Sequence, residues 1–95
     1  MDEIKRLYAG KITNVETQVF DLTNGAVLKS ILISNLTSVE SEVILKIDAE
    51  EFIFTVQAKK TLIVDNPIVC NIFKVHSIGE TVLSIHVSGI QLGGA

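Results

Sequence analysis

The chain has 95 residues, of which 47% are hydrophobic, and its formal net charge is −3 at pH 7. This length fits a single domain, 1–95, and the acidic balance, with Arg6 as the one arginine, excludes the clustered cations that nucleic-acid binding requires. Polar residues interrupt every apolar run well before the ~20 positions that span a bilayer, so no membrane partner is expected. Val, Ile and Thr make up about a third of the residues, which predicts an all-β fold.

The N-terminal part of the chain predicts a lead-in followed by two strands. Residues 1–6 are rich in charge, and we expect a flexible segment without the apolar stretch of a signal peptide. An extended segment is predicted from Leu7 to Val15, and a strand from Thr17 to Leu22. Asn24-Gly25 follows, and both residues tolerate positive φ. We therefore expect a hairpin turn there, leading directly into the next strand.

The stretch Val27 to Ile47, VLKSILISNLTSVESEVILKI, is predicted to be the hairpin on which the other strands pack. In its first arm, Val27 to Asn35, the two alternating sets both carry apolar residues, which indicates a central strand covered on both faces. These sets are Val27, Ile31 and Ile33 on one side, and Leu28 and Leu32 on the other. In the second arm, Glu42 to Ile47, the residues Val43, Leu45 and Ile47 define one covered face. The polar turn between the arms, Asn35 to Ser41, contains side chains that bond their own backbone.

Three further segments precede the last strand. Glu51 to Val56 is predicted to be a strand with Phe52 and Phe54 in the core. The chain turns at Ala58 to Lys60 and forms a short strand from Leu62 to Val64, which Asp65-Asn66-Pro67 ends. Ile68 to His76 is either one bent strand or two short ones, Ile68 to Asn71 and Ile72 to His76.

The last strand, Thr81 to Gln91, has the clearest alternation in the chain, and a turn at Ser77 to Glu80 precedes it. Leu83, Ile85, Val87 and Gly89 are predicted to face the core. The outward stripe consists of Val82, Ser84, His86 and Ser88. It is either a plain solvent face or a flat surface for a partner subunit, and these four residues are our candidate assembly face. Residues 92–95 are expected to be a frayed tail.

Turn signals that recur about every 8–12 residues, without a sustained helical period, predict a β-sandwich or a β-barrel, of which we favour an antiparallel β-sandwich. We expect about seven or eight strands with jelly-roll or immunoglobulin-like connections.

The sequence contains no recognisable catalytic motif. Cys70, His76 and His86 are residue types that bind zinc, but they are scattered and form no local pair, so we expect neither a metal site nor a cofactor. Cys70 lies in the apolar run IVCNIF, where a buried, unreactive thiol is the ordinary interpretation. We therefore predict that the protein is not an enzyme.

The segments VLKSILISNLTSVESEVILKI and TVLSIHVSGIQL resemble a class of small structural proteins encoded in the virion gene clusters of tailed phages and prophages. The matching pattern runs from Val27 to Asn35, through Val43, Leu45 and Ile47, then Leu62 to Pro67, and closes at His86 to Gly89, so it covers most of the chain from Tyr8 onward. The chain departs from the pattern at Cys70 to Lys74, where members of the class often have a glycine-rich turn.

This resemblance implies a non-catalytic β-sandwich subunit of a phage or prophage particle, in the tail or on the head surface. Such a subunit would form a homo-oligomer or dock onto other virion proteins, and it would be made in the bacterial host cytoplasm. The alternative is a ligand-binding sandwich that recognises carbohydrate or peptide. Sugar-binding modules use exposed aromatic residues, and this chain has no Trp and one Tyr.

Overall fold

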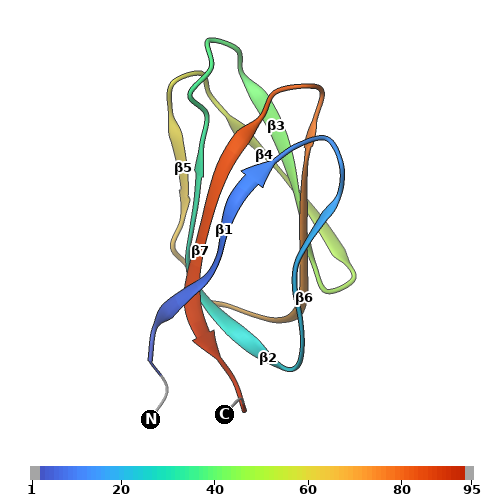
Figure 1. Cartoon of the computed structure of the whole chain (residues 1–95), viewed down its shortest axis with the longest axis vertical. Helices are drawn as coiled ribbons and strands as arrows, with labels where there is room; N and C mark the ends of the chain where they lie inside the picture. Colours follow the sequence, from blue (N-terminus) through green and yellow to red (C-terminus); the bar gives the residue numbers. More distant parts are fainter. Residues whose placement is uncertain (1–2, 94–95) are drawn as a thin grey trace.

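The computed structural model describes residues 3–93 and contains seven strands in one antiparallel sheet (Figure 1). The strands are β1 (Lys5–Ile12), β2 (Thr17–Ser34), β3 (Ser41–Ile47), β4 (Glu50–Val56), β5 (Thr61–Val64), β6 (Ile68–Ile78) and β7 (Leu83–Gln91). Their order in the sheet is β1-β7-β2-β6-β3-β4, and β5 pairs with β2 beside this path. The predicted all-β class and the number of strands are confirmed.

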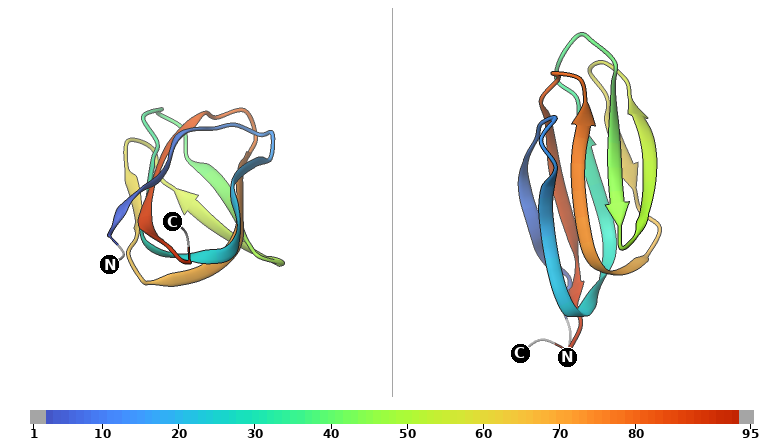
Figure 2. Two further views of the ribbon diagram at one scale, coloured as in Figure 1. Left: turned by 60° about the horizontal axis from the view of Figure 1, so that its bottom comes forward. Right: turned by 90° about the vertical axis from the view of Figure 1, so that its right-hand side faces the viewer.

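Strand β2 joins two halves of the sheet. Its first part pairs with β6, and its last part pairs with β7 on one side and β5 on the other. We call β1, β7, the end of β2 and β5 the β7 half, and the start of β2, β6, β3 and β4 the β6 half. The sheet curls so that the two halves enclose a single apolar core (Figure 2). Because β2 hydrogen-bonds across both halves, the predicted division into two sandwich sheets stays a prediction, as does the predicted wiring.

The hairpin predicted at Asn24-Gly25 is wrong, because β2 runs through these residues without reversing. Gly25 does adopt positive φ, at 81°, but within an irregular stretch of the pairing with β6. The Asn71 side chain donates to the carbonyl oxygens of Leu22 (3.1 Å) and Thr23 (2.9 Å), and the Leu92 amide donates to that of Gly25 (2.9 Å). Partners distant in sequence therefore satisfy the backbone groups that a hairpin turn would have paired locally.

The hairpin predicted between the arms of Val27 to Ile47 is also wrong. Strand β3 pairs with β4 and β6, and β2 lies on the far side of β6. The polar segment between β2 and β3 is a loop that crosses from one half of the sheet to the other. Its side chains do bond the local backbone, as Asn35 Oδ1 accepts hydrogen bonds from the amide (3.0 Å) and the hydroxyl (2.7 Å) of Thr37.

The inward set of β2 differs from the predicted one. Against β7, the register of β2 shifts between Leu28 and Ser30, and this extra residue changes the face on which later side chains lie. Leu28, Ile31 and Ile33 are consequently buried together. Leu32, which we expected to be covered, is 36% exposed on the outer side.

Strand β4 is less buried than predicted, because it lies at the end of the sheet with β3 as its one strand neighbour. Phe52, predicted to be in the core, is 46% exposed, and Phe54 is half-buried against the core cluster. Val56 alone among the inward side chains of β4 is fully buried. The inward face of β3 is as predicted, with Val43 and Leu45 buried and Ile47 packed beside them.

Strand β7 matches its predicted pattern. Leu83, Ile85 and Val87 are buried, and Gly89 is needed because a Cβ there would overlap the Val27 carbonyl oxygen. The strand begins at Leu83, two residues later than predicted, so Val82 belongs to the preceding connection. Residues 68–78 form one strand, the first of the two alternatives, and it extends through Ser77 and Ile78, where we predicted a turn.

The two predicted loose ends are more ordered than expected within the described residues. Lys5 and Arg6 belong to β1, where they lie opposite Gly89 and Ser88 of β7. Leu92 follows β7 and is held by its hydrogen bond to Gly25. Residues 1–2 of the predicted lead-in and 94–95 of the predicted tail lie outside the described residues.

Candidate functional site

The outward stripe of β7 lies in the middle of the β7 half. Strand β7 pairs with β1 on one side and with β2 on the other, so it is not an edge strand. Ser84 and Ser88 are half-buried between neighbouring strands, and His86 is exposed. Val82 is 50% exposed but precedes the strand. The structure thus places three of the four predicted residues on one outer face and the fourth beside it.

Cross-strand pairing extends this stripe into a surface four strands wide. The central row consists of Ala9 of β1, His86 of β7, Leu32 of β2 and Ile63 of β5. A second row runs through Lys11, Ser84, Ser34 and Thr61, and a third through Arg6, Ser88 and Ser30. We call these eleven residues the β7 face. The residues that β1, β2 and β5 contribute could not be predicted from the sequence. They lie beside the β7 residues because of pairing between strands that are distant in the chain.

Small side chains dominate the β7 face. Several of its hydroxyl groups bond within the face, since Lys11 Nζ donates to Ser84 Oγ at 2.9 Å and Ser34 Oγ lies 3.2 Å from Thr61 Oγ1. A shallow hollow of about 270 Å³ lies beside His86 and is lined by Leu32, Ser34, Thr61, Ser84, Ile85 and His86. Apolar and hydroxyl groups are thus interspersed on this surface.

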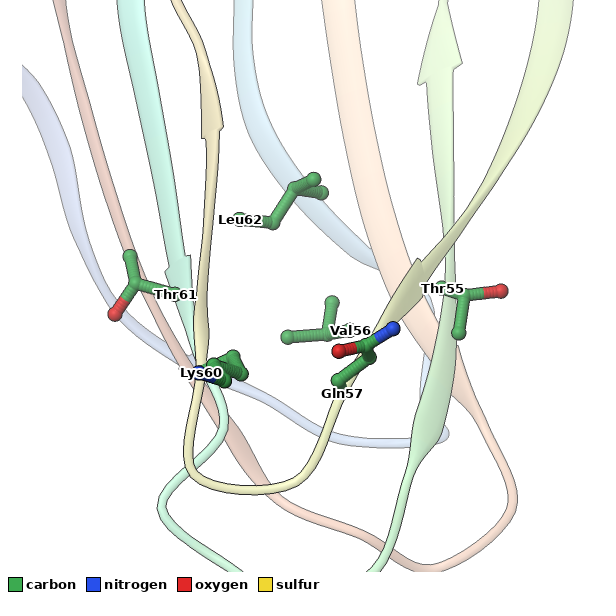
Figure 3. A pocket seen from close by; sticks show the side chains of 6 residues that line it. All are labelled: Thr55, Val56, Gln57, Lys60, Thr61 and Leu62. Atoms are coloured by element: carbon green, nitrogen blue, oxygen red, sulfur yellow. The ribbon is translucent and has the colours of Figure 1, made fainter.

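A second hollow, of about 280 Å³, lies where β4 and β5 diverge from their shared turn. It is lined by Thr55, Val56, Gln57, Lys60, Thr61 and Leu62. Figure 3 shows Val56 and Leu62 between the two strands, with Thr55 on the opposite side of β4. The hollow is therefore the open end of the core and contains no cluster of ionisable groups.

The residues considered as metal ligands lie apart. His76 is on β6 opposite Ile44, in the β6 half, whereas His86 is on β7. Among residues 3–93, no group of three His, Cys, Asp or Glu side chains is arranged to hold a metal ion. Cys70 is buried, as predicted, and burial raises the pKa of its thiol to about 11, with the nearby Asp48 carboxylate adding to the shift. A thiol of this kind is a poor nucleophile at neutral pH.

Three carboxylates, those of Glu16, Glu51 and Asp48, take part in exposed ion pairs or backbone contacts. Lys46 Nζ lies 3.1 Å from Glu16 Oε1 and 3.7 Å from Glu51 Oε2, and its hydrogen bond lowers the pKa of Glu16. Asp48 Oδ1 accepts hydrogen bonds from the amides of Asn71 (2.9 Å) and Ile72 (3.1 Å). These contacts tie the β3–β4 turn to β6 and give Asp48 a structural role.

The part of the chain that the structure describes contains no helix of the length and apolarity needed to cross a membrane. No family model matches the chain, and a search of curated proteins found no match.

Proposed function

We propose that the chain is a non-catalytic structural subunit of a phage or prophage particle, placed in the tail or on the head surface. It acts by self-association or by docking onto other virion proteins, and it is made in the bacterial host cytoplasm before joining the virion. The resemblance of the segments VLKSILISNLTSVESEVILKI and TVLSIHVSGIQL to such proteins motivates this proposal.

The observation that carries the proposal is the β7 face. Four strands present a surface whose central row, Ala9, His86, Leu32 and Ile63, contains no side chain with a permanent charge. Lys11 and Arg6 lie on β1, at the margin of the face. A surface with apolar groups at its centre and charge at its margin has the anatomy of a protein–protein interface.

A ligand-binding module is the second candidate, and the hollow beside His86 is the feature that favours it. The hydroxyls of Ser34, Thr61 and Ser84 and the His86 imidazole line this hollow, and such groups bind small polar ligands. The residues that line the hollow include no Phe, Tyr or Trp for sugar stacking, which favours the assembly role. Binding on a glycan array that His86→Ala abolishes would support this candidate.

Arginine substitutions on the β7 face test the assembly role. We expect Ser84→Arg and Ser88→Arg to lower the oligomer mass measured by light scattering toward the 10.3 kDa of one chain, because each places a charge within the proposed interface. Gln18→Arg is the matched control, since Gln18 is exposed on the β6 half. Circular dichroism checks that each variant is folded. Unchanged masses in both serine variants would contradict the assignment of the interface to the β7 face.

A further inference from the structure

Three of the described strands have a free edge: β1, β4 and β5. Edge strands expose unpaired backbone groups, and proteins usually protect them with charge, bulges, prolines or short length. Strand β1 carries Lys5, Arg6 and Lys11 and has an irregularity between Arg6 and Tyr8. Strand β5 is four residues long, and Pro67 follows it closely. These two edges are therefore protected against pairing with another chain.

Strand β4 is less protected, because its two charged residues both lie at its start. It pairs with β3 in continuous register over all seven residues, without a bulge, and it contains no lysine, arginine or proline. Phe52 is 46% exposed on its inner side, and Ile53 is 61% exposed on its outer side. Away from their shared turn, β4 and β5 diverge (Figure 1), and β3 is the one strand that pairs with β4 among the described residues. An extended strand can therefore be added there.

The charges along this edge indicate which strand fits. Its two acidic residues, Glu50 and Glu51, both lie at the start of β4, and Lys59 and Lys60 follow just beyond its end. A parallel copy of β4 would place the glutamates of the two chains side by side. An antiparallel copy instead brings Glu50 of each chain toward Lys60 of the other, and all four glutamates are separated into two pairs at opposite ends. The edge is self-complementary in the antiparallel orientation.

We propose that two copies of this chain pair through their β4 strands, antiparallel and about a two-fold axis at Ile53. In this register, Ile53 lies opposite its counterpart and Phe52 lies opposite Phe54 of the second copy. The inner sides of the two β4 strands then form one continuous surface, on which Phe52 and the Phe54 of the second copy are cross-strand neighbours. The pairing rests on the proposed function in that copies of the chain associate, but it uses a surface distinct from the β7 face.

Cysteine cross-linking tests this pairing and its register. Ile53→Cys places two thiols opposite each other at the axis, where mild oxidation forms a disulfide between chains. Thr55→Cys is the matched control, because Thr55 is exposed on the same outer side of the same strand. In the proposed register, the two Thr55 positions are four residues apart, about 13 Å at about 3.3 Å per residue, which is too far for a disulfide. Both variants also contain the native Cys70, which is buried. The amount of covalent dimer formed by the wild type under the same oxidation therefore measures any cross-linking through Cys70.

We expect the covalent dimer on a non-reducing gel to be at least about tenfold more abundant for Ile53→Cys than for Thr55→Cys. Adding Glu50→Lys to the Ile53→Cys chain should lower this yield, and adding Lys60→Glu as well should restore it, because the charges are exchanged between the two ends. Equal yields for Ile53→Cys and Thr55→Cys would overturn the pairing.

Different results would contradict the β4 pairing and the association through the β7 face. An oligomer in light scattering that persists in Ile53→Lys, together with no specific cross-link at residue 53, would overturn the β4 pairing and leave the β7 face intact. A specific cross-link in chains whose mass is unaffected by Ser84→Arg and Ser88→Arg would support the β4 pairing and contradict the assignment to the β7 face.

Discussion

Replacing Phe73 with alanine is expected to lower the free energy of unfolding by about 3–5 kcal/mol, the usual cost of removing a fully buried ring. Phe73 of β6 is completely buried and packs against Phe20 of β2, with ring centroids 5.9 Å apart. The two rings pack between β2 and β6 within the core. The alanine variant would leave a cavity that the surrounding strands cannot close, because they are held by hydrogen bonds on both sides of β6. Urea unfolding followed by circular dichroism measures the change.

Phe52→Ala is the matched control for this variant. It removes the same ring from a position that is 46% exposed, so we expect a loss below about 1 kcal/mol. Measurement at low protein concentration keeps the effect of chain association small. Equal losses for the two phenylalanines would contradict the described division between the buried β6 and the open edge at β4.

Replacing Asn35 with alanine is expected to lower the free energy of unfolding by about 2–4 kcal/mol, because it leaves several buried polar groups without a partner. Asn35 is buried, and its side-chain amide donates to the carbonyl oxygens of Val39 (2.8 Å) and Val56 (3.1 Å). Its carbonyl oxygen accepts the two hydrogen bonds from Thr37. One side chain thus joins the β2–β3 loop to the end of β4.

Asn24→Ala is the control for Asn35. The Asn24 side chain is exposed and makes one hydrogen bond, of 3.3 Å, to the Gly93 carbonyl oxygen, so its loss should cost less than about 0.5 kcal/mol. Chemical denaturation of both variants under the same conditions makes the comparison. If Asn35→Ala were as stable as Asn24→Ala, the hydrogen bonds of the loop would have no part in holding the two halves of the sheet together.

The fold class and the faces of β3 and β7 could be predicted from the sequence, because alternation over several residues depends on burial alone. Leu83, Ile85 and Val87 on β7, and Val43 and Leu45 on β3, are buried as expected. Pairing partners could not be predicted in the same way. Residues that follow one another along the chain, such as those of β2 and β3, end on opposite sides of β6.

The Asn24-Gly25 segment shows why the local signal was insufficient. The positive φ predicted there is present at Gly25, yet the chain continues in the same strand. Hydrogen bonds from Asn71 and Leu92, which are distant in sequence, decide between a turn and a bulge. In the same way, Phe52 was predicted to be in the core because aromatic residues usually are, and its exposure follows from the position of β4 at the end of the sheet.

The candidate site was found in part. Sequence alternation identified Ser84, His86 and Ser88 as outward residues of β7, and the structure places them on one face. Leu32 and Ile63, which supply the apolar groups of the central row, were not identified because their position beside His86 depends on the pairing of β2 with β5 and β7.

The most direct test of the assembly role is the solution mass of the unmodified chain, measured by light scattering over a wide range of concentrations. The proposal predicts a mass that is a whole multiple of the 10.3 kDa of one chain and that stays constant until dilution dissociates it. A mass of 10.3 kDa at every concentration would contradict self-association through either the β7 face or β4, and would leave docking onto another particle protein as the remaining form of the proposal.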